Sequence, residues 1–258
     1  MQNLTKNTIK EIRALEQRKG RREQHAWLAE GNRMVGDLLA SDAFPCRRLV
    51  ATGEWWEAHP EFAQVAAESY QVTPAEMQRV SLLQAPQDVL AVFDESRKTV
   101  ASNDTDTLSI LLDEVQDPGN LGTIIRTADW FGVRDIYCAP GTADCFNPKV
   151  VQATMSALAR VRVHYFESKS EECEWLKNRQ CPIYGTFLEG DNIYTTRLLT
   201  PAILVMGNEG RGVSPEVAAL VTDKLLIPHF SSDGQHVESL NVSIATAICL
   251  SEILSRAR

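Results

Sequence analysis

The sequence predicts an α/β protein whose larger, C-terminal part is a mostly parallel sheet with helices on both faces. Apolar runs of strand length alternate with segments of helical periodicity, which is the order of elements in such folds. The apolar run LSILLD at 108–113 is typical of a strand buried on both faces. The stretch ESRKTVASNDTD at 95–106 has no apolar periodicity and separates this part from a smaller one before it.

The first part, residues 1–94, has the pattern of a small α/β domain. Its strand candidates and helix candidates alternate: strands at 26–30, 47–52 and 88–93, and helices at 32–39 and 74–83. The second helix has Thr73 as N-cap, Pro74 in its first turn and Glu76 at the third position, which is a capping-box pattern. We therefore predict a domain over 1–94, a linker over 95–106 and a second domain over 107–258.

In the second domain the alternation is clearer. Strands are predicted at 108–113, 135–139, 160–166, 182–187, 202–206 and 224–227, and helices at 120–131, 150–158, 170–179, 215–221 and 239–255. Ligands of such sheets bind just past the carboxyl ends of the strands. The segments that follow the strands are therefore the candidate functional segments.

Composition narrows the classes of protein. With 44% hydrophobic and 23% charged residues, the 258-residue chain is globular rather than disordered or fibrous. Its net charge of −8 excludes a protein that coats nucleic acid indiscriminately. Six cysteines without metal-site spacing, a polar N-terminal segment and no run of 18 apolar residues favour a cytoplasmic protein with free thiols, no metal site and no membrane span.

Three segments after strands carry polar residues. In DPGNLGTIIRTADWFGV at 117–133, Asn120 is the expected N-cap of a helix in which Arg126 is the one cation of an apolar stretch. A solvated arginine at the edge of an ordinary helix would give the same pattern.

The segment GNEGRGVS at 207–214 has three glycines in six residues behind a buried strand, and Ser214 is the expected N-cap of the next helix. Such a loop exposes backbone amides to an anion or a nucleobase edge, although it could be a plain turn. It has neither the lysine of a P-loop nor the order of a dinucleotide fingerprint. The segment SLNVS at 239–243 opens the last helix, where Ser239, Asn241 and Ser243 could cap the helix or bind a ligand.

Together, N-x-G-x-x-R, G-N-E-G-x-G and S-L-N-V-S, in this order, closely resemble the three motifs of the SpoU (TrmH-like) family of RNA 2′-O-ribose methyltransferases, over residues 107–258. Residues 4–94, through KGRREQHAWLAEGNRMV at 19–35, resemble the RNA substrate-binding module that often precedes this domain. The resemblance implies a trefoil knot, an S-adenosylmethionine pocket made by the knot's loops, and a homodimer whose interface lies beside that pocket.

By position, the resemblance assigns two sets of residues. The cofactor is expected to contact Gly207, Asn208, Gly212, Ile227, Ser239 and Leu240. The catalytic set is Asn120, Arg126, Glu209 and Asn241. Because a guanidinium stays protonated in proteins, we expect Arg126 to bind the phosphate beside the target ribose and to orient the 2′-hydroxyl, with the other three fixing Arg126 and the ribose.

The resemblance also implies an RNA partner, with ribosomal RNA favoured and transfer RNA as the alternative. Residues 1–33 carry a net charge of +4, against −12 for the rest of the chain, and Lys19, Arg21 and Arg22 form the expected RNA-binding cluster together with Arg126. An ordinary charged helix face is the alternative explanation of that cluster. Two rival functions remain open: a non-catalytic RNA-binding protein of this fold, and another nucleotide-dependent enzyme that uses 207–214 for phosphate.

Overall fold

The computed structural model describes residues 3–97, 108–230 and 237–256, and the chain forms two compact units. The N-terminal unit comprises Met1–Ser102 and Asp144–Ala159, and the C-terminal unit comprises Asn103–Ala143 and Arg160–Arg258. Most of the predicted linker at 95–106 lies outside the described residues. The domain boundaries at 94 and 107 therefore stay predictions.

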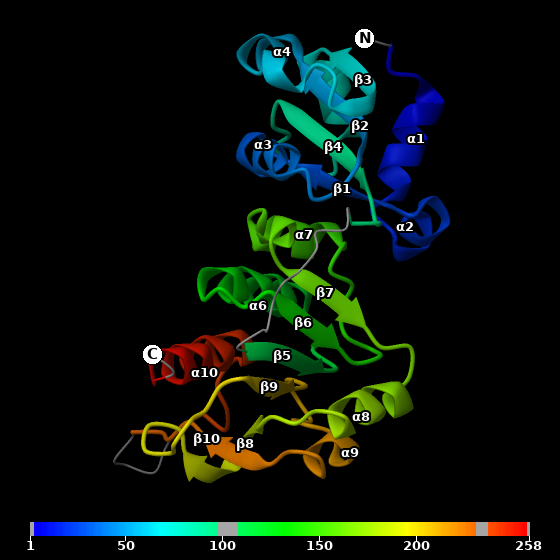
Figure 1. Ribbon diagram of the computed structural model, residues 1–258. Helices are drawn as coiled ribbons and strands as arrows, with labels where there is room; N and C mark the ends of the chain where they lie inside the picture. The colour runs from blue at the N-terminus through cyan, green and yellow to red at the C-terminus, as the bar shows by residue number, and fades with distance from the viewer. Residues whose placement is uncertain (1–2, 98–107, 231–236, 257–258) are drawn as a thin grey trace. The chain divides into compact units, whose positions relative to one another are not determined.

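The N-terminal unit is built on a four-stranded sheet of order β1-β4-β2-β3 (Figure 1). Strand β4 runs antiparallel to β1 and β2, whereas β2 and β3 are parallel. The strands are β1 (Ala26–Glu30), β2 (Cys46–Thr52), β3 (Ala66–Val72) and β4 (Val89–Asp94). Three of the four were predicted; β3, with the sequence AAESYQV, is half exposed and lacks a continuous apolar pattern.

Helices cover this sheet and close its core. They are α1 (Lys6–Ala14), α2 (Arg18–Gln24), α3 (Asn32–Ser41), α4 (Gly53–Ala58), a 3-10 turn (Pro60–Phe62) and α5 (Pro74–Val80). The capping box predicted for α5 is present, since Thr73 Oγ1 accepts the Glu76 amide while the Glu76 carboxylate accepts the Thr73 amide. Ile12 of α1 and Met77 of α5 pack with strand residues such as Leu28 in one core.

The segment 144–159, which follows β6 in the chain, packs within the N-terminal unit. Its helix α7 (Pro148–Thr154) lies against β1, where Gln152 Nε2 donates to the Glu30 carbonyl at 3.0 Å. Phe146 stacks on Trp27, with ring centroids 5.1 Å apart. The segment thus completes the core of the unit that the first 97 residues form.

Arg21 fastens this segment to the helices, which corrects its expected role as an RNA contact. Its side chain is only 2% exposed, and its guanidinium pairs with Asp144 at 2.6 Å. The same guanidinium donates to the carbonyls of Leu15 and Glu16 at 2.8 and 2.9 Å. Four N–H donors are used inside the fold and the side chain is buried, so Arg21 is not exposed to RNA phosphate.

The C-terminal unit contains a six-stranded, fully parallel sheet of order β10-β8-β9-β5-β6-β7. All six predicted strands are found: β5 (Leu108–Asp113), β6 (Asp135–Cys138), β7 (Arg162–Tyr165), β8 (Ile183–Asn192), β9 (Ala202–Gly207) and β10 (Asp223–Leu226). The predicted parallel α/β class is confirmed. The trefoil knot stays a prediction.

Helices flank both faces of this sheet. Figure 1 shows α6 (Pro118–Trp130) and α10 (Val242–Arg256) on one face, and α8 (Lys169–Lys177) and α9 (Pro215–Ala218) on the other. Leu176 of α8 and Val217 of α9 are buried against Leu111 and neighbouring strand residues. A short 3-10 turn (Ala157–Ala159) belongs to the N-terminal unit.

Helix α6 begins earlier than the sequence predicts. Its N-cap is Asp117, whose Oδ1 accepts the Asn120 amide at 2.8 Å, rather than Asn120 itself. Because Asp117 performs the capping, the Asn120 side chain is available for other contacts.

Within the described ranges, no helix is long and apolar enough to cross a membrane, and no group of three or more His, Cys, Asp or Glu residues is placed to hold a metal ion.

Candidate active site

The three polar segments meet at the carboxyl-end edge of the parallel sheet. Strand β5 ends at Asp113, which lies opposite Gly207, the last residue of β9. The segment after β5 leads into α6, and the segment after β9 is the loop 207–214. The register of the two central strands therefore brings the first two motifs side by side.

The loop 207–214 is a tight turn stabilised by Asn208. Asn208 and Gly212 exchange two backbone hydrogen bonds of 2.9 Å, while Asn208 Oδ1 accepts the amides of Gly210 and Arg211. Position 207 must be glycine, since a Cβ there would overlap the backbone of Gly212 and Val213. The glycines of this motif thus let the loop fold back on the end of its own strand.

Glu209 connects the loop to the start of α6. Its Oε1 accepts hydrogen bonds from Asn120 Nδ2 at 3.1 Å and from the Asp117 amide at 3.2 Å, and its Oε2 accepts the Gln116 amide at 3.3 Å. Burial alone would raise the pKa of Glu209, but the hydrogen bonds from Asn120 and the backbone outweigh it, so this pKa is lowered. Glu209 is therefore ionised at neutral pH and acts as an acceptor.

Asn120 also bonds to Asn241 of the third motif and so extends the hydrogen-bond chain. Its Oδ1 accepts Asn241 Nδ2 at 2.9 Å, and Asn241 Oδ1 in turn accepts the Ser243 amide and hydroxyl at 3.0 and 2.6 Å. Three of the four predicted catalytic residues thus form one continuous chain, Glu209–Asn120–Asn241. Because Asn241 caps α10, the same contacts fix the start of that helix.

Arg126 does not take part in this chain. It lies on α6 about 9 Å along the axis from Asn120, given the rise of a helix, and it is exposed. Within the described part of the chain it makes no hydrogen bond and no ion pair. The expectation that Asn120, Glu209 and Asn241 hold Arg126 is therefore not met, because these three residues bond to one another and leave the guanidinium free.

The residues predicted to contact a cofactor lie around the hydrogen-bond chain and differ in how exposed they are. Asn208 and Gly212 form the turn of the loop, Gly207 is buried beneath it and Ile227 is half-buried after β10. Leu240, next to Asn241, is 47% exposed, and Ser239 is exposed as well. Their cofactor contacts stay predictions.

Several residues of this site were not predicted from the sequence. Asp117 was recognisable in principle, since Asp before Pro-Gly is a common start of a turn or helix. Glu114 was not: it has a positive φ of 64°, and its carbonyl accepts Asn208 Nδ2 at 2.8 Å. A left-handed conformation at a glutamate leaves no signal in the sequence.

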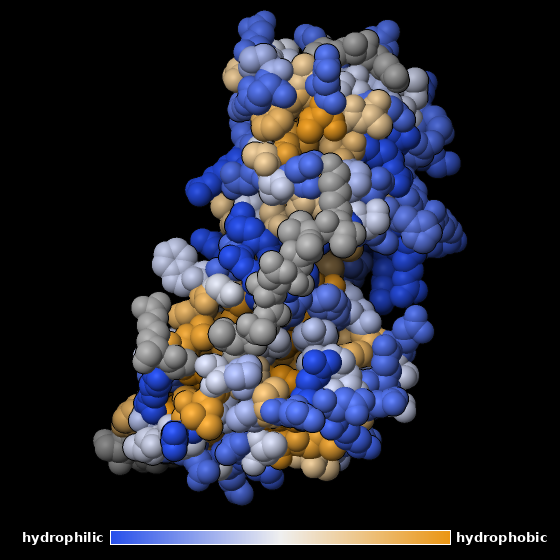
Figure 2. All heavy atoms as spheres, viewed as in Figure 1, coloured by the Kyte–Doolittle hydropathy of each residue, from blue (hydrophilic) through white to orange (hydrophobic). Residues whose placement is uncertain are grey.

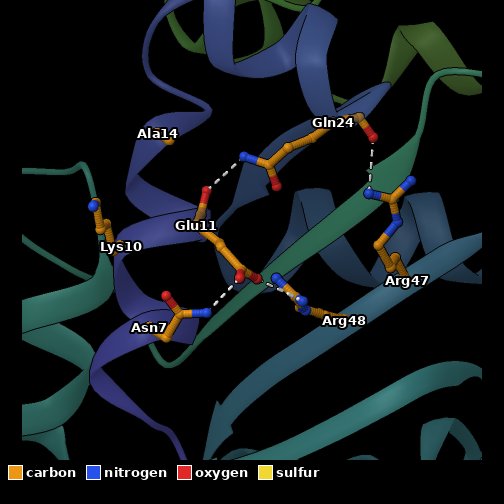
Figure 3. Close-up of a pocket in the computed structure, with 7 residues that line it drawn as sticks. All are labelled: Asn7, Lys10, Glu11, Ala14, Gln24, Arg47 and Arg48. Carbon is orange, nitrogen blue, oxygen red and sulfur yellow. Dashed lines mark hydrogen bonds and ion pairs between the residues drawn. The ribbon is translucent and has the colours of Figure 1, made fainter.

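A second polar site lies in the N-terminal unit, between α1, α2 and β2 (Figure 3). It is a cavity of about 480 Å³ lined by Asn7, Lys10, Glu11, Ala14, Gln24, Arg47 and Arg48. Glu11 is at its centre, bonded to Asn7 at 2.6 Å and to Arg48 at 2.9 Å. The lining has three cations and one anion, and Lys10 makes no hydrogen bond or ion pair within the described residues.

The protein thus combines a parallel α/β unit, which carries a polar hydrogen-bond chain at the carboxyl-end edge of its sheet, with a smaller unit. Residues 107–251 match the family model described as the SpoU rRNA Methylase family, and residues 6–91 match the MRM3-like substrate binding domain. The chain belongs to the SpoU rRNA methylase family, as the sequence motifs predicted.

Relatives with known names resemble the chain over nearly its whole length. The 23S rRNA (guanosine(2553)-2′-O)-methyltransferase RlmP of Bacillus subtilis is 31% identical over 93% of this chain and 93% of its own. A structure from Porphyromonas gingivalis, assigned to the TrmH family of RNA methyltransferases, superposes with a TM-score of 0.87 at 42% identity, covering 99% of this chain and 100% of that one. The AdoMet-bound rRNA methyltransferase of Sinorhizobium meliloti superposes with a TM-score of 0.84 at 29% identity, covering 98% and 96%.

We expect Glu209→Gln to destabilise the protein in a pH-dependent way. The lowered pKa means that the carboxylate contributes stability above its ordinary pKa of 4.5, and that this contribution is lost as the pH falls through the lowered value. The melting temperature of the wild type should therefore exceed that of Glu209→Gln at pH 7, and the gap should narrow as the pH falls below 4.5. Glu216→Gln, an exposed carboxylate without a hydrogen bond in the described structure, is the matched control. An equal gap at pH 4 and pH 7 would contradict the prediction.

Proposed function

We propose that this protein transfers a methyl group from S-adenosylmethionine to a ribose 2′-hydroxyl of RNA, with ribosomal RNA as the substrate class. The observation that carries the proposal is the hydrogen-bond chain Glu209–Asn120–Asn241, which joins one residue from each family motif at the edge where parallel sheets bind ligands. The rRNA preference is supported by relatives such as RlmP, whose name specifies a 23S rRNA substrate. A transfer RNA substrate is the alternative.

The residues around the loop 207–214 fit the cofactor chemically. Leu240, which is exposed, and Ile227, which is half-buried, offer apolar surface for an adenine beside this loop. S-adenosylmethionine supplies a methyl group that is already activated on sulfur. The protein's task is therefore to position the two reactants and to assist the loss of one proton.

In this proposal the hydrogen-bond chain and Arg126 have separate roles. The ionised Glu209 and the two asparagines hold the loop, α6 and α10 in one geometry and present polar atoms to the ribose. The exposed guanidinium of Arg126 binds the neighbouring phosphate and orients the 2′-hydroxyl, while that phosphate or water accepts the proton. Glu209 is a poor candidate for the acceptor, because its lowered pKa makes it a weak base.

We expect Arg126→Ala to lower kcat by about 10²-fold or more, the size seen for losing one contact that stabilises the transition state. S-adenosylmethionine affinity, measured by calorimetry, should remain. Arg126→Lys should recover part of kcat, since it keeps the charge but not the planar fork. Arg197→Ala, which removes an exposed arginine of the same unit, is the control. Near-normal turnover of Arg126→Ala would contradict the assignment.

The same variants identify the substrate. Mapping of 2′-O-methyl sites in RNA from a strain without the protein, complemented with wild type or Arg126→Ala, should show one site restored by the wild type only. A site in transfer RNA would favour the alternative substrate. Cofactor binding without any restored site would favour the non-catalytic RNA-binding protein.

For RNA binding we propose a basic surface on the N-terminal unit, made by α2 together with the cavity beside α1. Lys19 and Arg22 are exposed; Lys19 has only a 3.8 Å contact to Glu23, and Arg22 makes no hydrogen bond or ion pair in the described structure. Lys10 adds a third cation to this surface, at the cavity. Arg21, being buried, is left out. The match to a substrate-binding domain model over 6–91 supports this placement.

We expect Lys19→Glu with Arg22→Glu to weaken RNA binding and to reduce the salt slope of log Kd by about one to two, because each lost phosphate contact removes nearly one released counterion. The control carries the same charge change at Arg33→Glu with Lys149→Glu, two other exposed cations of this unit. Filter binding between 50 and 200 mM salt measures both. An unchanged slope in the first variant would exclude this surface.

We further propose that the protein is a homodimer and acts in the cytoplasm. Cys46, Cys173, Cys181 and Cys249 are free thiols, which suits a reducing compartment. For the dimer, α6 and α10 lie side by side and expose large apolar side chains: Trp130 is 86% and Ile244 is 51% exposed. Figure 2 shows apolar side chains at the surface in this region. Exposed apolar area of this kind commonly marks an interface.

We expect the wild type to sediment at twice the mass of the chain, and Ile244→Glu to shift it toward the monomer, because a buried unpaired charge opposes association. Leu188→Glu places the same charge at another exposed apolar residue, 70% exposed on β8, and should leave the mass unchanged. A monomeric wild type would overturn the dimer.

A further inference from the structure

A cluster of three charges, a half-buried lysine between two buried carboxylates, lies beside the loop 207–214 in the C-terminal unit. Asp113, the last residue of β5, is 1% exposed, and its Oδ1 accepts Lys169 Nζ at 2.6 Å. Lys169 is the first residue of α8, and its Nζ also lies 2.8 Å from Glu172 Oε2, an ion pair. Glu172 is 0% exposed. None of these three residues belongs to the hydrogen-bond chain of the candidate active site.

Asp113 holds both ends of the loop. Its backbone lies opposite Gly207, where the loop begins, and its Oδ2 accepts the amide of Ser214, where the loop ends, at 2.6 Å. The next residue, Glu114, adds two contacts within the loop, from its carbonyl to Asn208 at 2.8 Å and from its carboxylate to Arg211 at 2.5 Å. The end of β5 is therefore the frame from which Glu209 reaches Asn120.

Lys169 is the cation that stabilises the buried Asp113 carboxylate where it holds the loop. A buried carboxylate is costly unless it is paired and hydrogen-bonded, and the ion pair of Asp113 in the described structure is with Lys169. Lys169 Nζ also lies 3.4 Å from Ser214 Oγ, so the ammonium touches both the strand end and the loop end. Without it, Asp113 would keep the Ser214 amide but would be a buried carboxylate without a cation.

We propose that Lys169 is a positioning residue for the methyl-transfer site: through Asp113 it fixes both ends of the loop 207–214. The catalytic part of this inference rests on the proposed function. Lys169 touches neither Asn120 nor Glu209 in the described structure, and it acts through the position of the loop. Its removal loosens the cofactor loop while the sheet, whose strands are held by their own apolar core, stays folded.

Glu172 competes with Asp113 for the same ammonium. Its burial raises its pKa, although Lys169 lowers it in part; Asp113 and Glu114 add to the rise. A carboxyl with a raised pKa favours the folded state below its ordinary pKa of 4.5, and this contribution is lost as the pH rises through the raised value. Glu172→Gln should therefore gain melting temperature relative to the wild type as the pH rises from 4.5 to 7, and it leaves Lys169 to Asp113 alone.

The test compares Lys169→Met with Lys169→Arg, and uses Lys177→Met, an exposed lysine at the end of α8, as control. Lys169→Met should raise the Kd for S-adenosylmethionine at least 10-fold and lower kcat, with KM for RNA unchanged. Lys169→Arg should stay within threefold of the wild type, and Lys177→Met should match it. Lys169→Met with wild-type Kd and kcat would overturn the proposal.

A second variant tests the contact between Asp113 and the Ser214 amide, here called the clamp, without changing Lys169. Ser214 has φ −62°, which proline adopts, so Ser214→Pro removes the amide that Asp113 accepts without changing this dihedral. It should reproduce the raised Kd of Lys169→Met, and Ser214→Ala should lose less because its amide remains. Equal Kd values for the proline and alanine variants would count against the clamp. This comparison remains decisive if Lys169→Met does not fold.

Hydrogen exchange separates this proposal from the proposed function. In Lys169→Met, amides of 207–214 should exchange faster, while those of the N-terminal unit keep their wild-type rates. If the wild type neither binds S-adenosylmethionine nor methylates RNA, the proposed function fails, and the exchange rates still decide whether Lys169 fixes the loop. Unchanged exchange at 207–214 would overturn the clamp.

Discussion

The pairing of β5 with β9, with Asp113 opposite Gly207, is the contact on which the candidate site depends. Parallel strands end at the same edge, so this register sets the start of α6 beside the loop 207–214. Side-chain contacts then lock the two segments: Asn208 to the Glu114 carbonyl, and Glu209 to the amides of Gln116 and Asp117. A shift of one residue would turn Asp113 to the opposite face and remove its bond to Ser214.

The sequence predicts the C-terminal sheet well, since all six predicted strands are present. The signal is strongest for β5 and β9, which are buried along almost their whole length and therefore leave continuous apolar runs. It predicts the N-terminal unit less well. Helix α2, RKGRREQ, is too polar to show a helical apolar face, and β3 is half exposed. Contacts between distant segments leave no local pattern, which is why the packing of 144–159 against β1 was not foreseen.

The same distinction applies to the candidate site. Asn120, Glu209 and Asn241 were predicted from motif positions, and the structure joins them. That Arg126 lies outside this hydrogen-bond chain could not be predicted. Asn120 and Arg126 lie on the same helix, α6, but Asn120 bonds to Glu209 and Asn241 whereas Arg126 is exposed. Charge is a similar case: Arg21 looks like part of a basic cluster in the sequence, yet Asp144, 123 residues away, draws it into the fold. A count of basic residues overstates the charge that RNA can meet.

The site's own chemistry limits which groups can accept the proton of the 2′-hydroxyl. The two asparagines have no basic atom, and the Arg126 guanidinium keeps its charge. Glu209 carries the one carboxylate of this hydrogen-bond chain, but that carboxylate already accepts three hydrogen bonds, from the Asn120 side chain and the amides of Gln116 and Asp117, and these bonds lower its pKa. A base of such low pKa gains little by taking a proton from an alcohol. None of these four residues is suited to accept the proton, which supports our proposal that the RNA phosphate or water accepts it and that these residues contribute geometry rather than basicity.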